Sequence, residues 1–459
     1  MSEVTAATYP TSGEQVKKVK KIIIRRRVSL WDNFPVLLLA IVYAGFFVID
    51  DFGISAKIFV VIMAAALLVH ILLHLKDILD YSPTRIFVCF FGIVILIVLN
   101  IRELDYFSRH PFYLFTLFYS LLTIPFMRFN LKTAKTLFVL LIIPGLIAAT
   151  LIILNKVSAS TYQSYVLSFL SKSSAEEYYF LRGEGYGAVM GRNIGLTGSY
   201  LTTGMILSFV YLLRGNRKNK GLLVLFALMF LYMGVGLLFL NRRGEPLGLL
   251  LALYIILIIH SKKRQAILMF SLPIGILLAL TLALFIYVIP SDVFGANSRL
   301  FALLQSAKGV DITNGRARLY AIAIDLFAKN HVFGVGWGGF AQYGSKSIEI
   351  VNNVHNIYLQ LFTELGVFSV IILLVLIILI IREAKKNRPP LSLWSISAYG
   401  LIAFILAFGL FDNPIFQDYF FVYFIPVIYF LGLGRKNTHG LRINIRRGNR
   451  SKNEQQVNS

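Results

Sequence analysis

A histidine at the boundary between a polar segment and an apolar run is the first candidate for chemistry in this chain. His355 ends the polar segment, and the apolar run begins near Asn356. A histidine side chain has an unperturbed pKa of about 6.5, so its neutral ring accepts a proton near pH 7. The N-terminus of a helix also favours the neutral ring. His355 is therefore a candidate general base; the alternative is a polar anchor at the membrane interface.

Arginines form the second candidate group. Arg242 and Arg243 lie in a short hairpin between two apolar runs, close to Glu245. A guanidinium group binds phosphate through two parallel hydrogen bonds, which lysine cannot reproduce. Arginine near a bilayer is costly unless it is paired or solvated, so snorkelling or an ion pair with Glu245 is the alternative. The same side of the membrane is expected to hold Arg192, Arg316 and Arg318. Together these arginines predict an anionic ligand.

No metal or cofactor is expected. His70 and His74 have a spacing that two metal ligands could use, but they lie in an apolar run without a third ligand nearby. The predicted outer loops contain no Asp-x-Asp pattern that could hold a divalent cation. The run Gly334-Val335-Gly336-Trp337-Gly338-Gly339 resembles a phosphate-binding loop only superficially, because it follows a helical pattern and not a strand. A tight turn that brings the backbone close to a neighbour is favoured instead.

Long apolar runs must position these residues. The chain of 459 residues is 57% hydrophobic and 15% charged, and its mean hydropathy is +0.73. A soluble domain has about 25% charged residues, so most of this surface must face lipid. We predict an all-α, polytopic membrane protein with about 12 transmembrane helices. The predicted spans are 34–49, 54–75, 86–101, 111–127, 133–154, 194–213, 221–240, 246–260, 265–289, 356–381, 392–410 and 419–434.

The distribution of charge predicts the orientation. If residues 1–29 lie in the cytoplasm, the short loops rich in Lys and Arg also lie inside, and so does the tail 435–459. The net charge of +23 then resides on the inner face, as the positive-inside rule requires. Topology and attraction to anionic lipid explain the basic composition, so a nucleic-acid partner is not indicated. The N-terminal segment lacks the features of a cleaved signal peptide, and Cys89 is the single cysteine, so no intramolecular disulfide is possible.

Residues 30–434 are expected to form one transmembrane domain with two longer outer loops. The smaller loop covers about 155–193 and the larger about 290–355. Within the larger loop, the segment 317–329 has apolar residues at the spacing of one helix face. We predict an amphipathic helix that lies at the outer interface and ends near Gly334.

Four motifs in order resemble those of the O-antigen ligase and O-antigen polymerase family of bacterial membrane glycosyltransferases. They are Arg243-Gly244, Gly315-Arg316, Gly334-Val335-Gly336, and His355-Asn356-Ile357-Tyr358-Leu359 followed by Glu364-Leu365-Gly366. The resemblance covers about 130 residues of this chain. Two positions depart from it: Arg242 stands where serine is commoner, and the segment around Arg192 matches loosely.

The resemblance implies a fold of the C-type glycosyltransferase kind, with a cavity that opens to the outer face. It also implies a donor glycan on a polyprenyl pyrophosphate lipid, a glycan acceptor and no metal. His355 would remove the proton of the acceptor hydroxyl, and the arginines would neutralise the pyrophosphate. The supporting residues would be Asn356, Tyr358, Glu364 and Glu245. A flippase and a chain-length regulator are possible protein partners.

These expectations favour a polymerase that joins lipid-linked repeat units of a surface polysaccharide, such as an exopolysaccharide or capsule. It would act at the outer face of a bacterial plasma membrane. The nearest alternative is a ligase that transfers finished glycan to another acceptor. A lipid-linked oligosaccharide flippase or transporter would need charged or broken helices at mid-membrane depth, whereas the predicted spans are nearly free of charge. A structural or scaffold role is the remaining alternative.

Overall fold

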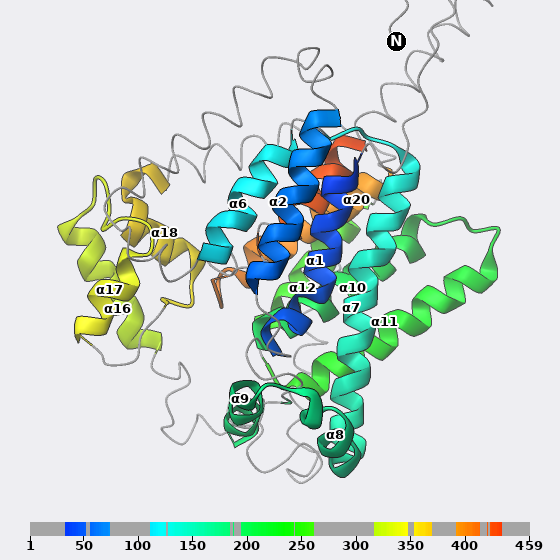
Figure 1. The fold of residues 1–459 in the computed structure, drawn as a ribbon, viewed down its shortest axis with the longest axis horizontal. Helices are drawn as coiled ribbons and strands as arrows, with labels where there is room; N and C mark the ends of the chain where they lie inside the picture. The colour runs from blue at the N-terminus through cyan, green and yellow to red at the C-terminus, as the bar shows by residue number, and fades with distance from the viewer. Residues whose placement is uncertain are drawn as a thin grey trace, which may run out of the picture.

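The computed structural model describes the parts of the chain that form the helical bundle and two smaller helical clusters (Figure 1). Every regular element in these parts is a helix, which confirms the predicted all-α fold class. The described residues are 33–51, 56–73, 111–124, 127–183, 187, 194–242, 244–260, 316–347, 353–369, 392–413, 420 and 423–433.

The bundle consists of long apolar helices whose limits lie within a few residues of the predicted spans. They are α1 (Phe34–Asp51), α2 (Ala56–Leu73), α6 (Pro111–Thr123), α7 (Leu131–Val157), α10 (Ile194–Arg214), α11 (Lys220–Leu240), α12 (Gly244–His260) and α20 (Leu393–Phe408). Three of them, α7, α10 and α11, are long and apolar enough to cross a membrane by length and composition. A further apolar helix covers Tyr423–Leu433. The predicted spans 86–101 and 265–289 lie outside the described residues.

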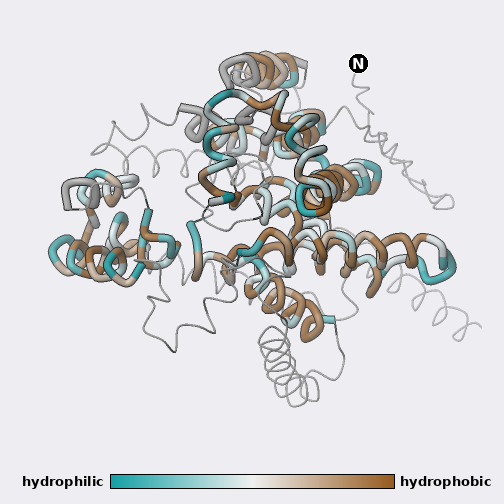
Figure 2. The backbone as a smooth tube through the Cα atoms, turned by 90° about the horizontal axis from the view of Figure 1, so that it is seen from below, coloured by the Kyte–Doolittle hydropathy of each residue, from teal (hydrophilic) through white to brown (hydrophobic). Residues whose placement is uncertain are grey.

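Helix α10 is the centre of the bundle. It packs against α7, α11, α12 and α20, and most of its residues are buried, whereas α11 is largely exposed. Small residues let the backbones approach closely, as is common between membrane helices. A Cβ atom on Gly145 of α7 would lie 2.6 Å from the carbonyl oxygen of Tyr200 in α10. The helices of the bundle are apolar along most of their length, and the hydrophilic residues gather near their ends (Figure 2).

The smaller predicted loop is partly helical. After α7 the chain forms α8 (Ala159–Tyr165), a short 3-10 helix (Leu167–Phe169) and α9 (Lys172–Gly183), which lie below the end of α7 in Figure 1. Tyr162 and Tyr178 are fully buried and their rings stack with centroids 5.6 Å apart. This aromatic pair holds α8 and α9 together.

The described part of the larger predicted loop and the start of the predicted span 356–381 form a second cluster beside the bundle (Figure 1). The loop contributes α16 (Arg316–Lys329) and α17 (Gly339–Ser347), and the predicted span contributes α18 (Ile357–Leu365). The helix predicted at 317–329 is confirmed as α16, although it ends at Lys329, five residues before Gly334. The apolar face of α16 packs through Ala323 against Phe340 and Val354. The structure therefore uses this face for packing within the cluster. The predicted position of the helix at the outer membrane interface stays a prediction.

The predicted span 356–381 is wrong as a single helix. Helix α18 ends at Leu365 because Gly366 adopts a positive φ of 58°, in the left-handed region. A Cβ atom at Gly366 would lie 2.5 Å from the carbonyl oxygen of Val332, so only glycine fits there. Apolar composition alone could not show this break. Helix α18 is thus a separate short element, and its position beside α20 creates the candidate site.

Candidate functional site

The C-terminal end of α20 is the platform of the site. A helix leaves its last carbonyl oxygens without partners inside the helix. The Tyr358 hydroxyl donates a hydrogen bond to the carbonyl oxygen of Leu406 at 2.7 Å. The side-chain amide of Asn356 donates to the carbonyl oxygen of Leu410 at 3.2 Å. Two of the predicted supporting residues therefore attach α18 to the end of α20.

Two further hydrogen bonds strengthen this attachment. The backbone N–H of Ile357 donates to the carbonyl oxygen of Gly409 at 2.8 Å. The guanidinium group of Arg316, at the start of α16, donates to the carbonyl oxygen of Phe411 at 2.8 Å. The predicted base and one predicted arginine are thus brought to the same turn, which directly follows α20.

His355 has a strained backbone and a half-exposed side chain. Its φ is 54°, in the left-handed region, which costs a residue other than glycine about 1–2 kcal/mol. Neighbouring contacts must hold such a conformation. The next residue, Asn356, caps α18 by accepting hydrogen bonds from the backbone N–H groups of Tyr358 and Leu359, both at 3.0 Å. The His355 side chain is 44% exposed, so one side of the ring can reach a substrate.

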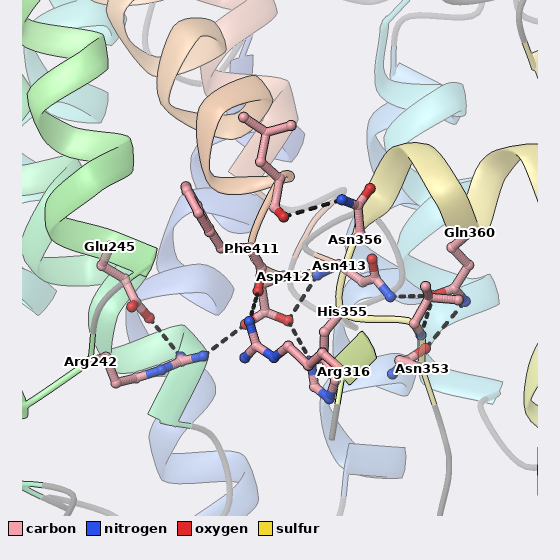
Figure 3. A network of polar contacts seen from close by, with 12 residues as sticks. Arg242, Glu245, Arg316, Asn353, His355, Asn356, Gln360, Phe411, Asp412 and Asn413 are labelled. Carbon is pink, nitrogen blue, oxygen red and sulfur yellow. Dashed lines mark hydrogen bonds and ion pairs between the residues drawn. The ribbon is translucent and has the colours of Figure 1, made fainter. Parts of the chain in front are cut away.

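Asp412 is the partner of His355 (Figure 3). Its Oδ1 lies 3.4 Å from Nδ1 of the ring, and Oδ1 also accepts a hydrogen bond from the backbone N–H of Asn413 at 2.8 Å. Burial raises the pKa of the Asp412 carboxyl, but the hydrogen bond from His355 and the charge of Arg242 outweigh burial and hold this pKa below its usual range. A carboxylate cannot donate a proton, so Nδ1 carries the hydrogen, and in the neutral ring Nε2 is the acceptor.

Arg242 connects this pair to the hairpin between α11 and α12. One nitrogen of its guanidinium lies 2.9 Å from Oδ2 of Asp412, and another lies 2.6 Å from Oε1 of Glu245. The Arg242 side chain is only 13% exposed. The ion pair with Glu245, which the sequence offered as an alternative, is therefore present. The role of Arg242 as a pyrophosphate ligand stays a prediction.

The buried end of this charge network is Glu245. Its side chain is fully buried in the first turn of α12. A Cβ atom on Gly198 of α10 would lie 2.5 Å from its Oε1, so the absent side chain of Gly198 makes room for the carboxylate. The hairpin turns at Asn241, the C-cap of α11, with a φ of 58°. Asparagine tolerates this left-handed conformation better than most residues.

Glu364, another predicted supporting residue, is fully buried and fixes the glycine-rich turn. Its Oε2 accepts a hydrogen bond from the backbone N–H of Gly338 at 2.8 Å, and its backbone carbonyl accepts one from Gly336 at 3.0 Å. Gly334, Gly336 and Gly338 all have positive φ values, so the prediction of a tight turn is confirmed. Glu364 therefore holds the glycine-rich turn in place through these two hydrogen bonds.

The structure places the remaining candidates less centrally. Arg318 is exposed on α16, two residues after Arg316. Arg192, Arg243 and the motif residue Gly315 lie outside the described residues. Within the described parts of the chain, no group of three or more His, Cys, Asp or Glu residues is arranged so that it could hold a metal ion.

Helical architecture and a charged site at one end of apolar helices define a polytopic helical membrane protein. Residues 228–374 match the family model described as O-antigen ligase, and no curated protein matches the chain. The match confirms the resemblance to the O-antigen ligase and polymerase family. It includes the Arg242 hairpin and His355, and it supports a function of the O-antigen ligase or polymerase type. Members of the family are glycosyltransferase-like enzymes of polysaccharide synthesis.

Sequence reasoning missed Asp412 and Asn413, which lie beyond the matched residues. The sequence did contain an indication of a polar site here, because Phe411-Asp412-Asn413-Pro414 separates two apolar runs on the side predicted to be outer. A carboxylate at such a point is costly unless it is paired. Gln360 was also missed, since a single glutamine inside an apolar run carries no pattern of its own.

Proposed function

We propose that the chain is a surface-polysaccharide polymerase that joins repeat units carried on polyprenyl pyrophosphate. The observation that supports this most strongly is the pair of His355 and Asp412, in which a buried carboxylate lies 3.4 Å from the ring of a half-exposed histidine. A base held in this way is suited to the activation of a hydroxyl group. The family match supports a glycosyl transfer as the type of reaction.

In the proposed reaction the acceptor hydroxyl attacks the anomeric carbon of the donor sugar. A new carbon–oxygen bond forms while the bond from that carbon to the pyrophosphate oxygen breaks. Nε2 of His355 accepts the hydroxyl proton, and the negative carboxylate of Asp412 stabilises the resulting imidazolium. The bonding electrons of the broken bond leave with the polyprenyl pyrophosphate.

Arginines would neutralise the charge that develops on the leaving group, so the proposed reaction needs no metal and no cofactor. Arg316 is the best placed of the described candidates because its guanidinium reaches the turn that carries Asp412. Arg243 follows Arg242 directly in the chain and remains a candidate from the sequence, as do Arg192 and Arg318. A guanidinium is preferred to an ammonium here because it can bind two phosphate oxygens at once.

The proposed reaction takes place at the outer face of a bacterial plasma membrane, with both termini in the cytoplasm. Two single-cysteine variants test this placement in a background in which Cys89 is replaced by Ser. A membrane-impermeant thiol reagent should label Ser345→Cys in intact cells, and should label Lys218→Cys only after lysis. The reverse pattern would overturn the outer-face reaction.

Purified protein tests the activity itself. Reconstituted with a lipid-linked repeat unit, it should form polymer and release free polyprenyl pyrophosphate. Single repeat units that remain unchanged under all conditions would contradict the polymerase.

A ligase is the second candidate because the matched family model is described as O-antigen ligase. The same base and arginines would serve, and only the acceptor would differ. Adding a second glycolipid acceptor, such as lipid A core, to the reconstituted system separates the two. A ligase would transfer the glycan to this acceptor and would not extend the lipid-linked repeat unit.

A further inference from the structure

Gln360 is the most fully bonded side chain at the site, although it touches neither His355 nor Asp412. Only 1% of the residue is exposed, in the middle of α18. Its Oε1 accepts hydrogen bonds from the backbone N–H of Val354 at 3.2 Å and from the side-chain amide of Asn413. Its Nε2 donates to Oδ1 of Asn353 at 3.2 Å and to Oε1 of Glu364 at 3.0 Å. A glutamine amide offers two donors and one oxygen with two lone pairs, so its capacity is used completely.

These contacts join the two segments that carry the proposed base and its partner (Figure 3). Val354 directly precedes His355, and Asn413 directly follows Asp412. One oxygen of Gln360 therefore holds both the backbone of Val354, just before His355, and the side chain of Asn413, just after Asp412. The backbone of His355 is in the left-handed region and needs such support from its surroundings.

The orientation of the Gln360 amide is itself determined. Glu364 is buried, and one of its oxygens already accepts the backbone N–H of Gly338. The other oxygen lies 3.0 Å from Nε2 of Gln360. The backbone N–H of Val354 can only donate, so the amide atom that it faces at 3.2 Å is the acceptor oxygen, and the opposite atom, Nε2, is the donor. The chemistry of glutamine, and not only its size, is required at this position.

We propose that Gln360 is a positioning residue for the reaction, acting through Val354 and Asn413 on the geometry of the His355–Asp412 pair. This inference rests on the proposed function of that pair. Loss of the Gln360 amide would leave His355 present but misaligned, and a displacement of about 1 Å can cost about 10²-fold in rate. The substrate-binding arginines would be unaffected, so binding should not weaken.

The test is Gln360→Met, which keeps the length of the side chain and removes all four hydrogen bonds. In the reconstituted polymerisation of lipid-linked repeat units, kcat should fall by about 10²-fold, while KM for the repeat unit stays within about threefold. The double variant Gln360→Met/Asp412→Asn should be no slower than the slower of the two single variants, because groups that act as a unit are not additive. Hydrogen exchange of residues 353–356 should also become faster.

Thr363→Val is the matched control. Thr363 is equally buried on α18, and its hydroxyl donates to the carbonyl oxygens of Ala323 and Leu359 at 3.0 and 2.8 Å. This variant removes buried hydrogen bonds without touching the connection between the two segments. It should unfold at a lower temperature and keep the wild-type kcat. If Gln360→Met does not fold, Gln360→Glu serves instead, since it keeps an acceptor oxygen and loses at least one donor.

Three results would overturn the proposal: a wild-type kcat in the Gln360 variants, a loss that adds fully to that of Asp412→Asn, or an equal loss of kcat in Thr363→Val. Hydrogen exchange distinguishes failure of this proposal from failure of the proposed function. If the wild-type protein transfers no glycan, the proposed function fails, and hydrogen exchange alone then tests whether Gln360 holds the His355 segment. Faster exchange at 353–356 in Gln360→Met would still support its role in holding the His355 segment, and unchanged exchange would contradict it.

Discussion

At both ends of the helical bundle, side chains hydrogen-bond backbone groups that have no partner inside a helix, but only one end also carries the charged residues of the candidate site. At the end where α1 and α7 begin, the side chain of Asn33 donates to the carbonyl oxygen of Arg128 at 2.6 Å and accepts from its backbone N–H at 2.8 Å. The Tyr429 hydroxyl also donates to this carbonyl, at 2.8 Å, and accepts from the backbone N–H of Asn130 at 2.9 Å. The side chains in these bonds are neutral.

At the other end, Tyr358 and Asn356 do the same work for the carbonyl oxygens of α20. The contacts at that end also include a buried carboxylate, its paired guanidinium and a half-exposed imidazole. Hydrogen bonding to unpaired backbone groups explains why both ends of the bundle carry polar side chains. It does not explain the pair of Asp412 and His355, so we expect function to depend on these two residues.

The largest difference between the ends should appear in His355→Ala. Loss of a general base costs about 10²–10⁴-fold in rate, so cells with this variant should accumulate single lipid-linked repeat units. The protein should be extracted at normal levels. The control is His331→Ala, an exposed histidine of the same cluster whose ring nitrogen lies 3.4 Å from the carbonyl oxygen of Ala328. Near-normal polymer from His355→Ala, or equal loss from both variants, would remove the distinction between the ends.

Asp412→Asn should have the next largest effect. The carboxamide keeps the shape of the side chain but supplies no negative charge to stabilise the imidazolium. Replacing a carboxylate that orients a metal-bound histidine typically costs about 10–100-fold in activity, and we expect a loss of the same order here. Turnover by purified protein measures this, with Asp325→Asn as the control, because Asp325 forms only an exposed ion pair with Lys329. Equal activity of the two variants would show that Asp412 serves the fold alone.

Arginine-to-lysine changes test the anionic ligand. Arg243→Lys and Arg316→Lys keep the charge but lose the two parallel hydrogen bonds, so activity should fall by about tenfold, which is 1.4 kcal/mol of binding. The change should appear mainly as a higher KM for the lipid-linked donor. Wild-type polymer length and yield in both variants would leave these residues as interfacial anchors, like polar residues at the opposite end.

Stability should respond to acid through Asp412. Its folded pKa is held below the unfolded value of about 3.9. The carboxylate therefore stabilises the fold above that pH, and this contribution is lost as the pH falls through the folded value. The unfolding temperature of the wild type should drop between about pH 5 and 3 by more than that of Asp412→Asn. Parallel curves for the two proteins would contradict this.

The smallest effect is expected at the opposite end. Tyr429→Phe removes a hydroxyl that hydrogen-bonds the backbone of Arg128 and Asn130 and the side chain of Asn33, so unfolding should become easier by about 1 kcal/mol. The turnover number should not change, because no charged group of the site is involved. A thermal unfolding curve and an activity assay on the same preparation measure both quantities. A large loss of turnover with normal stability would mean that the neutral end also takes part in function.

Much of the fold follows from composition and periodicity. The limits of α7, α10 and α11 agree with apolar runs in the sequence, because a helix that crosses lipid must satisfy its backbone internally and be apolar around its surface. The break at Gly366 could not be predicted, since it depends on the carbonyl oxygen of Val332, which is distant in sequence. Hydropathy describes each segment alone and not its neighbours.

The candidate site divides in the same way. The sequence indicated His355 and its supporting residues through a local motif, and charge patterning assigned them to one face. Asp412 and Gln360 carried no such pattern, because their importance comes from partners 57 and 53 positions away, His355 and Asn413.

The sequence by itself predicted an all-helical membrane protein that resembles the O-antigen ligase and polymerase family, with its candidate site residues in the segments between the predicted spans. Tertiary structure alone decided which residues meet: the end of α20, the hairpin before α12 and the segment before α18 converge at Asp412. The physical reason is that helix formation and lipid burial depend on local composition. Hydrogen bonds and ion pairs instead require atoms within about 3–4 Å of each other, which only the packing of distant segments achieves.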